Sequence, residues 1–467
     1  MLKPAIQTAS AESGKSYRVD LVVLGSGPAA KSVAVDAAES GHQVALVESR
    51  DFGGTCALRG CNPKKVLTNA AMLSDRVHLT ADKLFANASA ELDWQKLHAF
   101  QQEFTEPVAN NTEENLNDKG IQTFQGQSRF ISPRQLRIHS GRDNATLDSP
   151  RFLIATGARP RTLSFPGSEF VMTSGQFLAQ ERLPKRILFL GGGYISMEFG
   201  HVACSLGSEV TVLEKGEQLM KGFDPDLVEQ LKDWSSRKGM RLVMGRQIES
   251  IEQSADGSLV VTSDDQQRFH VDSVVHGAGR VPNLDDLNLE AANIDYTESG
   301  IRVDEYLRST SHPGVFAAGD CADNGGLMLT PIANEDAYVV GKNLFVDQPT
   351  KRPDYRGVAS VAFTCPPIAR VGMLESEAKE AGYDVDVKTR DTSTWGSVRK
   401  TGMPCAAYKV VLEKSSARIL GAHLLGVGAE EQVNLFAFAI KHGIDAKAIK
   451  ASPLAYPTMT ADIKRMV

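Results

Sequence analysis

The chain has 467 residues, with 51 lysines and arginines against 57 aspartates and glutamates, which gives a formal net charge of −6. This mild balance, without a basic tail, argues against a nucleic acid or an anionic membrane as partner. A single core rarely grows past roughly 250–300 residues, so we expect several domains. Residues 1–19 are polar and lack the apolar stretch of an export signal. We therefore expect a frayed tail there and a cytoplasmic protein without membrane spans.

The first predicted unit is a strand, a helix and a second strand between residues 19 and 48. Gly25, Gly27 and Ala30 follow the first apolar strand, and the second strand ends at Glu48. Gly25 permits a tight turn, Gly27 lets the backbone approach a pyrophosphate, and the small Ala30 permits close helix–strand packing. Glu48 is placed to accept hydrogen bonds from a ribose diol. The unit predicts a dinucleotide site.

A close pair of cysteines, Cys56 and Cys61, follows this unit. In a reducing compartment such a pair is more often catalytic or metal-binding than structural. A zinc site would need a second Cys/His pair at suitable spacing, and the sequence offers none. A helix start together with Lys64 and Lys65 is expected to lower the pKa of a thiolate here. The sequence therefore predicts a redox-active pair.

A second strand–helix–strand unit occupies residues 186–214. Its first strand leads to Gly191 and Gly193, its helix begins at Tyr194, and its second strand ends at Glu214. One glycine fingerprint alone is weak evidence, because glycine-rich turns are common between strands and helices. Two complete copies indicate two nucleotide sites.

The remaining elements complete the organisation. The glycine turn at Thr156-Gly157 is matched by a turn at Gly279, and residues 314–320 are expected to form a buried strand that is closed by Gly319 and Asp320. In open α/β sheets, ligands bind at this carboxyl end of a strand. After about residue 350 we expect alternating strands and one amphipathic helix, residues 430–442, in a separate terminal domain.

Four cysteines stand apart from the pair. Isolated thiols of this kind are usually small buried hydrophobes, so we expect structural roles for them. Cys405 is the least certain, because it follows Pro404 in an expected loop. The four are Cys204, Cys321, Cys365 and Cys405.

Taken in order, these motifs resemble the pyridine nucleotide-disulfide oxidoreductases, the family of glutathione reductase, dihydrolipoamide dehydrogenase and mercuric reductase. The resemblance runs from about residue 18 to the end of the chain. It implies an α/β fold with two Rossmann-like nucleotide-binding domains, for FAD and NAD(P), and a C-terminal α+β dimerisation domain in a homodimer. The implied boundaries are 1–160 for the first part of the FAD domain, 161–283 for the NAD(P) domain, 284–350 for the second FAD part and 351–467 for dimerisation.

The resemblance also implies catalytic roles. Cys61 would contact the flavin ring, while Cys56 would face the substrate and perform thiol–disulfide interchange. One of Lys64 and Lys65 would pair with Glu198, and adjacency alone does not decide which. Tyr194 would cover the nicotinamide pocket, although an aromatic residue that opens a helix is more often packing.

Cofactor binding follows the same resemblance. Asp320 would hold the ribityl chain of FAD, and Glu48 its adenosine ribose. Glu214 favours NADH over NADPH, because a carboxylate accepts from a free ribose diol and repels a 2′-phosphate. The flexible Lys215 beside it keeps NADPH open as the alternative. The other expected cofactor-binding residues are Gly25, Gly27, Ala30, Gly54, Thr55, Thr156, Gly157, Gly191, Gly193 and Gly279.

The C-terminal motif departs from the family pattern. Disulfide reductases of the family carry His-Pro-Thr-x-x-Glu, whereas this chain has Tyr456 at the histidine position and Ala461 at the glutamate position. A phenol, with a pKa of about 10, does not replace imidazole as a proton shuttle at neutral pH. Mercuric reductases have a tyrosine in this neighbourhood. Tyr456 either acts on the cysteine pair of the other subunit or packs at the dimer interface.

The expected function is transfer of hydride from NADH through FAD to the Cys56–Cys61 disulfide, and then to an unidentified disulfide or other acceptor. One alternative keeps the fold and makes the enzyme similar to mercuric reductase, or a reductase of quinones or oxygen. Another makes the chain a flavoprotein subunit of a larger redox assembly.

Overall fold

The computed structural model describes residues 8–10, 15–86 and 90–467. The chain divides into two compact units, and each is built from three stretches of sequence. Within the described residues, no helix is long and apolar enough to cross a membrane. Unit 1 comprises Met1–Pro63, Gln102–Arg161 and Arg280–Tyr355, and unit 2 comprises Lys64–Gln101, Thr162–Gly279 and Arg356–Val467.

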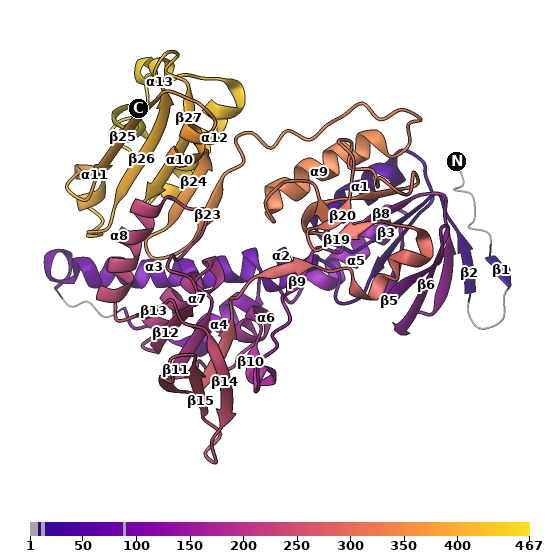
Figure 1. Ribbon diagram of the computed structural model, residues 1–467, viewed down its shortest axis with the longest axis horizontal. Helices are drawn as coiled ribbons and strands as arrows, with labels where there is room; N and C mark the ends of the chain where they lie inside the picture. The colour runs from indigo at the N-terminus through magenta and orange to yellow at the C-terminus, as the bar shows by residue number, and fades with distance from the viewer. Residues whose placement is uncertain (1–7, 11–14, 87–89) are drawn as a thin grey trace. The chain divides into compact units, whose positions relative to one another are not determined.

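Unit 1 is built on one large sheet (Figure 1). Four of its strands are parallel and wholly buried, as expected where both faces of a parallel sheet are covered. They are β3 (Leu21–Leu24), β4 (Val44–Glu48), β8 (Phe152–Ile154) and β21 (Val315–Ala317). The sheet continues through β5 (Gln122–Ser132), β6 (Gln135–Gly141), β7 (Ala145–Asp148), β2 (Lys15–Arg18) and β1 (Thr8–Ser10).

The expectation of a frayed N-terminal tail is wrong for Lys15–Arg18. These residues pair in parallel with Ala145–Asp148, so their backbone groups are used by the ladder between β2 and β7. Residues 1–7 and 11–14, which belonged to the same expectation, lie outside the described residues.

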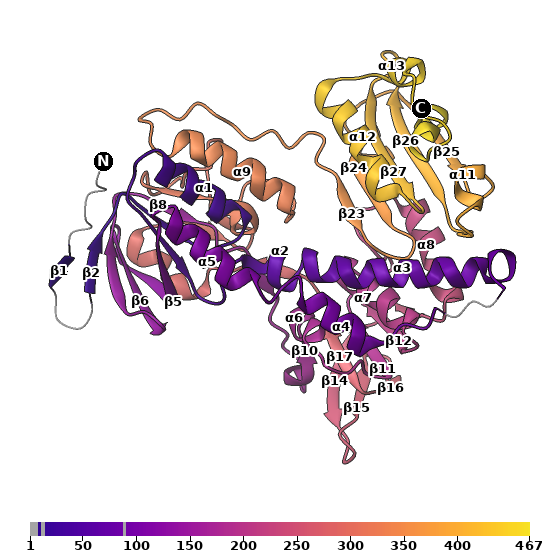
Figure 2. The same ribbon diagram turned by 180° about the vertical axis from the view of Figure 1, so that it is seen from behind.

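Helices cover one face of this sheet. α1 (Pro28–Glu39) and α9 (Thr330–Asn343) lie side by side, and their apolar residues share a core with β3 and β4 (Figures 1 and 2). The other face packs against the 3-10 helices η2 (Asp285–Leu287) and η3 (Leu289–Ala292). This arrangement brings residues 28–39 and 330–343 together on one face of the sheet.

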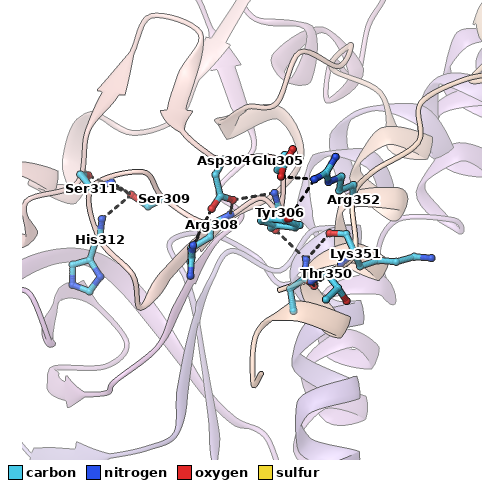
Figure 3. Close-up of polar contacts among 11 residues, drawn as sticks. Asp304, Glu305, Tyr306, Arg308, Ser309, Ser311, His312, Thr350, Lys351 and Arg352 are labelled. Carbon is cyan, nitrogen blue, oxygen red and sulfur yellow. Dashed lines mark hydrogen bonds and ion pairs between the residues drawn. The ribbon is translucent and has the colours of Figure 1, made fainter. Parts of the chain in front are cut away.

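The residues that follow α9, up to residue 352, are held by hydrogen bonds to a loop of the same unit. Asn343, 1% exposed, donates to the carbonyl oxygens of Tyr306 and Lys351 and accepts from the N–H groups of Thr350 and Lys351. Arg352 donates to the Tyr306 hydroxyl at 3.3 Å, as Figure 3 shows. Every polar atom of the buried Asn343 amide is therefore satisfied, and the chain is fixed up to residue 352.

Unit 2 contains a second parallel sheet and two antiparallel sheets. The parallel sheet has the order β10 (Val171–Met172), β17 (Ser273–His276), β11 (Arg186–Leu190), β12 (Glu209–Glu214) and β13 (Arg241–Met244). Its core is shared with α3 (Cys61–Leu84), α4 (Trp94–Gln102), α6 (Ser174–Leu178), α7 (Tyr194–Ser205) and α8 (Pro225–Arg237). The antiparallel strands β14 (Ile248–Gln253), β15 (Leu259–Ser263) and β16 (Arg268–Val271) pack against the other side.

The C-terminal part of unit 2 is an antiparallel sheet, and α12 (Ala429–His442) covers one of its faces (Figure 2). The strands follow the order β23 (Ser360–Ala362), β24 (Ile368–Gly372), β27 (Ile419–Leu425), β26 (Ala407–Glu413) and β25 (Val385–Asp391). The expectation of a single helix here is wrong. The additional helices have only four to six residues, too few for a periodic apolar pattern. They are α10 (Glu375–Glu380), α11 (Gly396–Arg399), α13 (Ala446–Ala451) and α14 (Ile463–Met466).

Short elements complete the description. They are α2 (Gly54–Arg59), α5 (Val108–Asp118), β9 (Ala158–Pro160), β18 (Arg280–Pro282), β19 (Tyr296–Thr297), β20 (Gly300–Arg302), β22 (Ala322–Asp323), η1 (Ser168–Phe170), η4 (Gly319–Cys321) and η5 (Thr460–Asp462).

Candidate active site

The two close cysteines lie on helical segments that meet at Gly60. Cys56 lies within α2, and Cys61 is the first residue of α3. A Cβ atom at Gly60 would lie 2.9 Å from the carbonyl oxygen of Thr55, so glycine lets the chain turn between the two helices. Both cysteines are reduced thiols, with Cys61 exposed and Cys56 partly buried. Cys56 donates a hydrogen bond to Cys61. The structure therefore brings the predicted pair together.

Thr330, the first residue of α9, contacts both sulfurs. Its hydroxyl donates to Sγ of Cys56 at 3.4 Å and lies 3.8 Å from Sγ of Cys61. The sequence reasoning missed this residue. Pro331 behind it is a typical helix-start signal, and it could have located the start of α9. It could not have shown that the cysteine pair lies opposite.

The protonation of Cys56 differs from the sequence expectation. The hydrogen bond that Cys56 donates to Cys61, followed by burial, raises the pKa of the Cys56 thiol, and the smaller effect of the Thr330 hydroxyl lowers it. The expectation of a lowered pKa is therefore wrong for Cys56. The physical reason is that the neighbouring sulfur is the acceptor, so ionising Cys56 would cost that hydrogen bond.

The first glycine fingerprint forms an open cradle at the start of α1. A Cβ atom at Gly25 would lie 2.4 Å from the carbonyl oxygen of Ala155, and one at Gly54 would lie 2.6 Å from Cα of Gly27. Both glycines have positive φ, +99° and +74°. Side chains are thus excluded where the backbone must approach a ligand closely. Ala30 is buried against the sheet, as the fingerprint predicts.

Glu48 lies at the end of β4, beside this cradle. Its carboxylate accepts from the Ser26 hydroxyl at 2.6 Å and from the Arg50 N–H at 3.0 Å. The Ser26 hydroxyl in turn accepts from the N–H of Gly53 at 2.9 Å. A carboxylate has about four acceptor positions, so oxygen lone pairs remain for a ribose diol.

Asp320 lies in η4, directly after β21. Burial raises the pKa of its carboxyl group, and Arg280 partly offsets the effect. Within the described residues, this carboxylate accepts no hydrogen bond. A partly buried acceptor of this kind fits a ligand that brings hydroxyl groups, such as the ribityl chain of FAD.

The loop before Asp320 is held by a second, fully buried acid, Asp336 on α9. Its carboxylate accepts from the N–H of Gly319 at 2.8 Å, from the Asn324 amide at 2.6 Å and from the Tyr355 hydroxyl at 2.5 Å. These three donors lower the pKa of Asp336 and offset part of the cost of burying its charge, although burial has the larger effect and the pKa is raised. Sequence reasoning missed Asp336, because nothing local marks it.

The residues of unit 1 therefore fit FAD: a cradle free of side chains, a strand-end acid, and the partly buried Asp320 carboxylate, which accepts no hydrogen bond from the described residues. The other expected FAD residues belong to the same unit. Thr55 is in α2, and Thr156 and Gly157 form the turn between β8 and β9, with Gly157 at φ +68°.

In unit 2, the structure selects Lys64 as the partner of Glu198. The Lys64 ammonium lies 2.7 Å from each carboxylate oxygen, and the Glu198 side chain is wholly buried. The Phe363 N–H also donates to Glu198 at 2.8 Å. The ammonium of Lys65 lies instead 4.4 Å from the Phe363 ring centroid. Adjacent helical residues point in different directions, so only one of the two lysines can face α7.

A second buried contact fixes the same segment. His201, one turn after Glu198 on α7, accepts at Nδ1 from the N–H of Cys365 at 2.8 Å, and its Nε2 lies 2.8 Å from the Ser235 hydroxyl. Burial is the largest cause that lowers the pKa of His201, to about 3. The His201 ring is therefore uncharged, and its hydrogen bond holds residues 363–365 against α7.

The second glycine fingerprint is also formed as predicted. A Cβ atom at Gly191 would lie 2.7 Å from the carbonyl oxygen of Gly277, and Gly193 is the N-cap of α7. Glu214, at the end of β12, accepts from the N–H groups of Gly192 at 2.5 Å and Gly216 at 2.7 Å. Gly279 has φ +100°.

Two tyrosines of unit 2 are exposed. Tyr194, 44% exposed, opens α7 with its ring centroid 5.9 Å from the Lys64 ammonium. Tyr456 is 88% exposed, between α13 and η5. Tyr194 thus lies beside the Lys64–Glu198 pair of the same unit.

The isolated cysteines are buried or partly buried. Cys321, Cys365 and Cys405 are buried, and Cys204 is partly buried. Cys405 is only 4% exposed, with its thiol 3.8 Å from the carbonyl oxygen of Gln230. In the part of the chain that the structure describes, no group of three or more His, Cys, Asp or Glu residues could hold a metal ion.

Comparison with known proteins identifies the family. The model of the pyridine nucleotide-disulphide oxidoreductases matches residues 19–337, and the model of their dimerisation domain matches residues 358–467. The chain belongs to this family. The expected α/β fold with nucleotide-binding and dimerisation regions is confirmed, and the protein is an oxidoreductase of a family that uses FAD and NAD(P)H.

Individual relatives span almost the whole chain. The mercuric reductase of Lysinibacillus sphaericus is 30% identical over 95% of this chain and 81% of its own length. The glutathione reductase of Burkholderia cepacia is 30% identical over 96% and 98%. The Cu(II) complex of the HOCl-induced flavoprotein disulfide reductase RclA from Escherichia coli has a TM-score of 0.86 at 28% identity, covering 96% of this chain and 98% of that one.

Proposed function

We propose that this enzyme oxidises NADH and reduces its acceptor through the Cys56–Cys61 pair. The observation that carries the proposal is the arrangement of Cys56, Cys61 and Thr330. The two cysteines are reduced thiols that share a hydrogen bond, and the hydroxyl of Thr330, the first residue of α9, contacts both sulfurs. Thiols that only fill a core are buried, whereas Cys61 is exposed. An accessible, polar pair of this kind suits exchange chemistry.

FAD would be held by the cradle of Gly25, Gly27 and Gly54 with Glu48 and Asp320, and when bound it supplies hydride acceptance from the nicotinamide and electron delivery to the cysteines. Asp336 keeps the Asp320 loop in place through the Gly319 N–H. Cys61 would be the sulfur beside the flavin ring, and Cys56 would be the thiol for interchange.

NADH would be bound by the turn at Gly191 and Gly193, with Tyr194 over the nicotinamide. Glu214 supports NADH over NADPH, because a 2′-phosphate would meet a carboxylate that two backbone N–H groups already fix in place. The buried Lys64–Glu198 pair would present a fixed positive charge from the nicotinamide-binding unit.

A disulfide is the acceptor that the cysteine pair serves most directly. The reduced pair attacks one sulfur of the substrate disulfide, a mixed disulfide forms at Cys56, and Cys61 then closes the Cys56–Cys61 disulfide. Two electrons pass to the substrate, which takes up two protons and leaves as two thiols. We further propose a homodimer in a reducing compartment such as the cytoplasm, where these cysteines stay thiols.

A metal ion is the second candidate acceptor, favoured by Tyr456. This phenol stands where disulfide reductases of the family carry an acid–base histidine, and it is 88% exposed. Two accessible thiols are suitable ligands for a soft or oxidising metal ion. One NADH would reduce two Cu(II) to two Cu(I), or one Hg(II) to Hg(0). The names of the mercuric reductases and of the Cu(II) complex of RclA support this class of substrate.

The proposal is tested by anaerobic titration of the FAD-bound enzyme with NADH. A thiolate beside oxidised flavin gives a long-wavelength absorbance band, which we expect in the wild type and in Cys56→Ser and expect to be lost in Cys61→Ser. Persistence of the band in Cys61→Ser would overturn the assignment. Steady-state rates of NADH oxidation with disulfides, Cu(II), Hg(II) and quinones then identify the acceptor. If the protein turns over none of these acceptors and co-purifies with a partner protein, it is a subunit of a larger assembly.

A further inference from the structure

The chain that follows α9 runs back along the same helix. The backbone of residues 350–351 bonds to the side chain of Asn343, the last residue of α9. The Asp354 N–H then donates to the carboxylate of Glu335 at 3.0 Å, about two turns earlier on the helix. We call residues 350–355 the strap. Its contacts follow α9 in reverse order, so the strap lies along this helix within unit 1.

The last residue of the strap, Tyr355, meets the acid that holds the loop before Asp320. Its hydroxyl donates to Oδ1 of Asp336 at 2.5 Å. Oδ2 of Asp336 accepts instead from the Gly319 N–H at 2.8 Å and from the Asn324 amide at 2.6 Å. Asp336 is 0% exposed, so water does not replace a lost donor at little cost. One oxygen of the carboxylate therefore holds the strap, and the other holds the loop.

The Tyr355 hydroxyl also supports the charge on Asp336. Burial raises the pKa of Asp336, and among the three donors that lower it Tyr355 has the largest effect. Burial, and then the hydrogen bond to Asp336, raise the pKa of Tyr355, so the phenol keeps its proton and remains a donor. Without this hydroxyl, Oδ1 would be a buried anionic oxygen without a donor. The carboxyl group would then take up a proton or turn, and either change weakens its hold on Gly319.

We propose that Tyr355 is a positioning residue for FAD, which acts through Asp336 on the loop of Gly319 and Asp320. The inference rests on the proposed FAD site at Asp320. A loop that is fixed beforehand loses less conformational entropy when the cofactor binds, so a seated strap favours FAD binding. Because such coupling is reciprocal, bound FAD stabilises the seated strap by the same factor.

The test measures the dissociation constant of FAD for the full-length apoprotein by quenching of flavin fluorescence. Tyr355→Phe removes only the hydroxyl that reaches Asp336. Tyr306→Phe is the matched control, because it also removes one phenol contact of the strap, the hydrogen bond from Arg352 at 3.3 Å, which does not involve Asp336. Asp320→Ala reports on the FAD site itself.

We expect FAD to bind about fivefold more weakly to Tyr355→Phe, the effect of one hydrogen bond, and as tightly to Tyr306→Phe as to the wild type. In an Asp336→Asn background, Tyr355→Phe should add little, because the two residues act through one contact. Equal affinities of the two phenylalanine variants would overturn the proposal. An undiminished effect of Tyr355→Phe in the Asp336→Asn background would also overturn it, because Tyr355 would then act without Asp336.

Hydrogen exchange of the wild type gives a second measurement that needs no variant. FAD should slow the exchange of the strap amides by up to about fivefold, and equal exchange with and without FAD would contradict the coupling. The FAD site and the inference fail in different ways. Full FAD affinity in Asp320→Ala would overturn the proposed site and the inference with it, whereas loss of FAD in Asp320→Ala beside wild-type affinity in Tyr355→Phe would overturn the inference alone.

Discussion

Thr330 donates a hydrogen bond to the sulfur of Cys56 at 3.4 Å, although 274 residues separate the two in the chain. The same hydroxyl lies 3.8 Å from the sulfur of Cys61. The contact exists because α9 packs beside α1 on one face of the sheet, with its first residue at the cysteine pair. A thiolate on either cysteine would meet a hydroxyl donor and the positive end of a helix dipole.

Removal of this hydroxyl should make the thiolate less stable. Thr330→Val keeps the shape of the side chain, and Thr330→Ser is the control that keeps the donor. Because the Thr330 hydrogen bond lowers the pKa of Cys56, the valine variant should raise it. A neutral hydrogen bond contributes about 1 kcal/mol, so interchange with a disulfide at neutral pH should slow about fivefold. Stopped-flow oxidation of the reduced enzyme by a disulfide measures this, and equal rates for valine and serine would contradict it.

The Lys64–Glu198 pair should be sensitive to the loss of one partner. Glu198 is wholly buried and Lys64 is 14% exposed, so Glu198→Met leaves an ammonium with little water around it. Such a change typically costs about 3–5 kcal/mol, whereas replacing both partners is far less damaging. We therefore expect urea unfolding to show a large loss of stability in Glu198→Met and partial recovery in Lys64→Met/Glu198→Met. A double variant as unstable as the sum of both single variants would show that the pair is not coupled.

Glu214 should set the choice of nicotinamide cofactor. Glu214→Gln keeps an acceptor for the Gly192 N–H but removes the charge that repels a 2′-phosphate. We expect the ratio of kcat/KM for NADH to that for NADPH to fall by roughly tenfold, the effect of about 1.4 kcal/mol. Lys215→Met, at the exposed neighbouring position, should change the ratio the other way. An unchanged ratio in Glu214→Gln would remove this residue from cofactor choice.

Acid should destabilise unit 2 through His201. The folded-state pKa of this histidine is depressed to about 3, mainly by burial, whereas an unfolded histidine titrates near about 6.5. Its contribution to stability is therefore present above pH 6.5 and is lost as the pH falls toward 3, because only the unfolded chain binds the proton in this window. The free energy of unfolding should fall by up to about 1.4 kcal/mol per pH unit.

His201→Asn, which keeps an acceptor for the Cys365 N–H, should flatten that dependence while it lowers stability at pH 7. Part of the slope should remain, because burial also lowers the pKa of His423, to about 4. Urea unfolding at pH 7, 6, 5 and 4 compares the two proteins. A slope equal to that of the wild type would show that His201 is not the group that titrates.

The features that could be predicted from the sequence are those encoded by neighbours in the chain. The glycine fingerprints, the strand-end acids Glu48 and Glu214 and the Cys56–Cys61 spacing each act within about 30 residues, and the structure forms them. Contacts between residues that lie far apart in the sequence could not be predicted. Thr330 meets Cys56 through helix packing, and Lys64 is chosen over Lys65 by the direction in which each leaves α3.

Other parts of the site escape prediction because their determinants are three-dimensional. Asp336 is an ordinary helix residue until Gly319, Asn324 and Tyr355 bring donors to it. The raised pKa of Cys56 follows from its hydrogen bond with Cys61 and from burial, which the positions of basic residues in the sequence do not report. Short helices such as α13 lack the turns that a periodic pattern needs.

The central claim is that electrons leave the enzyme through Cys56. Its most direct test is the rate of NADH oxidation by the FAD-bound Cys56→Ser variant, compared with the wild type, in the presence of a disulfide acceptor. The account predicts a loss of at least about a hundredfold in acceptor-dependent turnover, while FAD stays bound and is still reduced by NADH. Undiminished turnover in Cys56→Ser would contradict it, because the acceptor would then receive its electrons without the thiol.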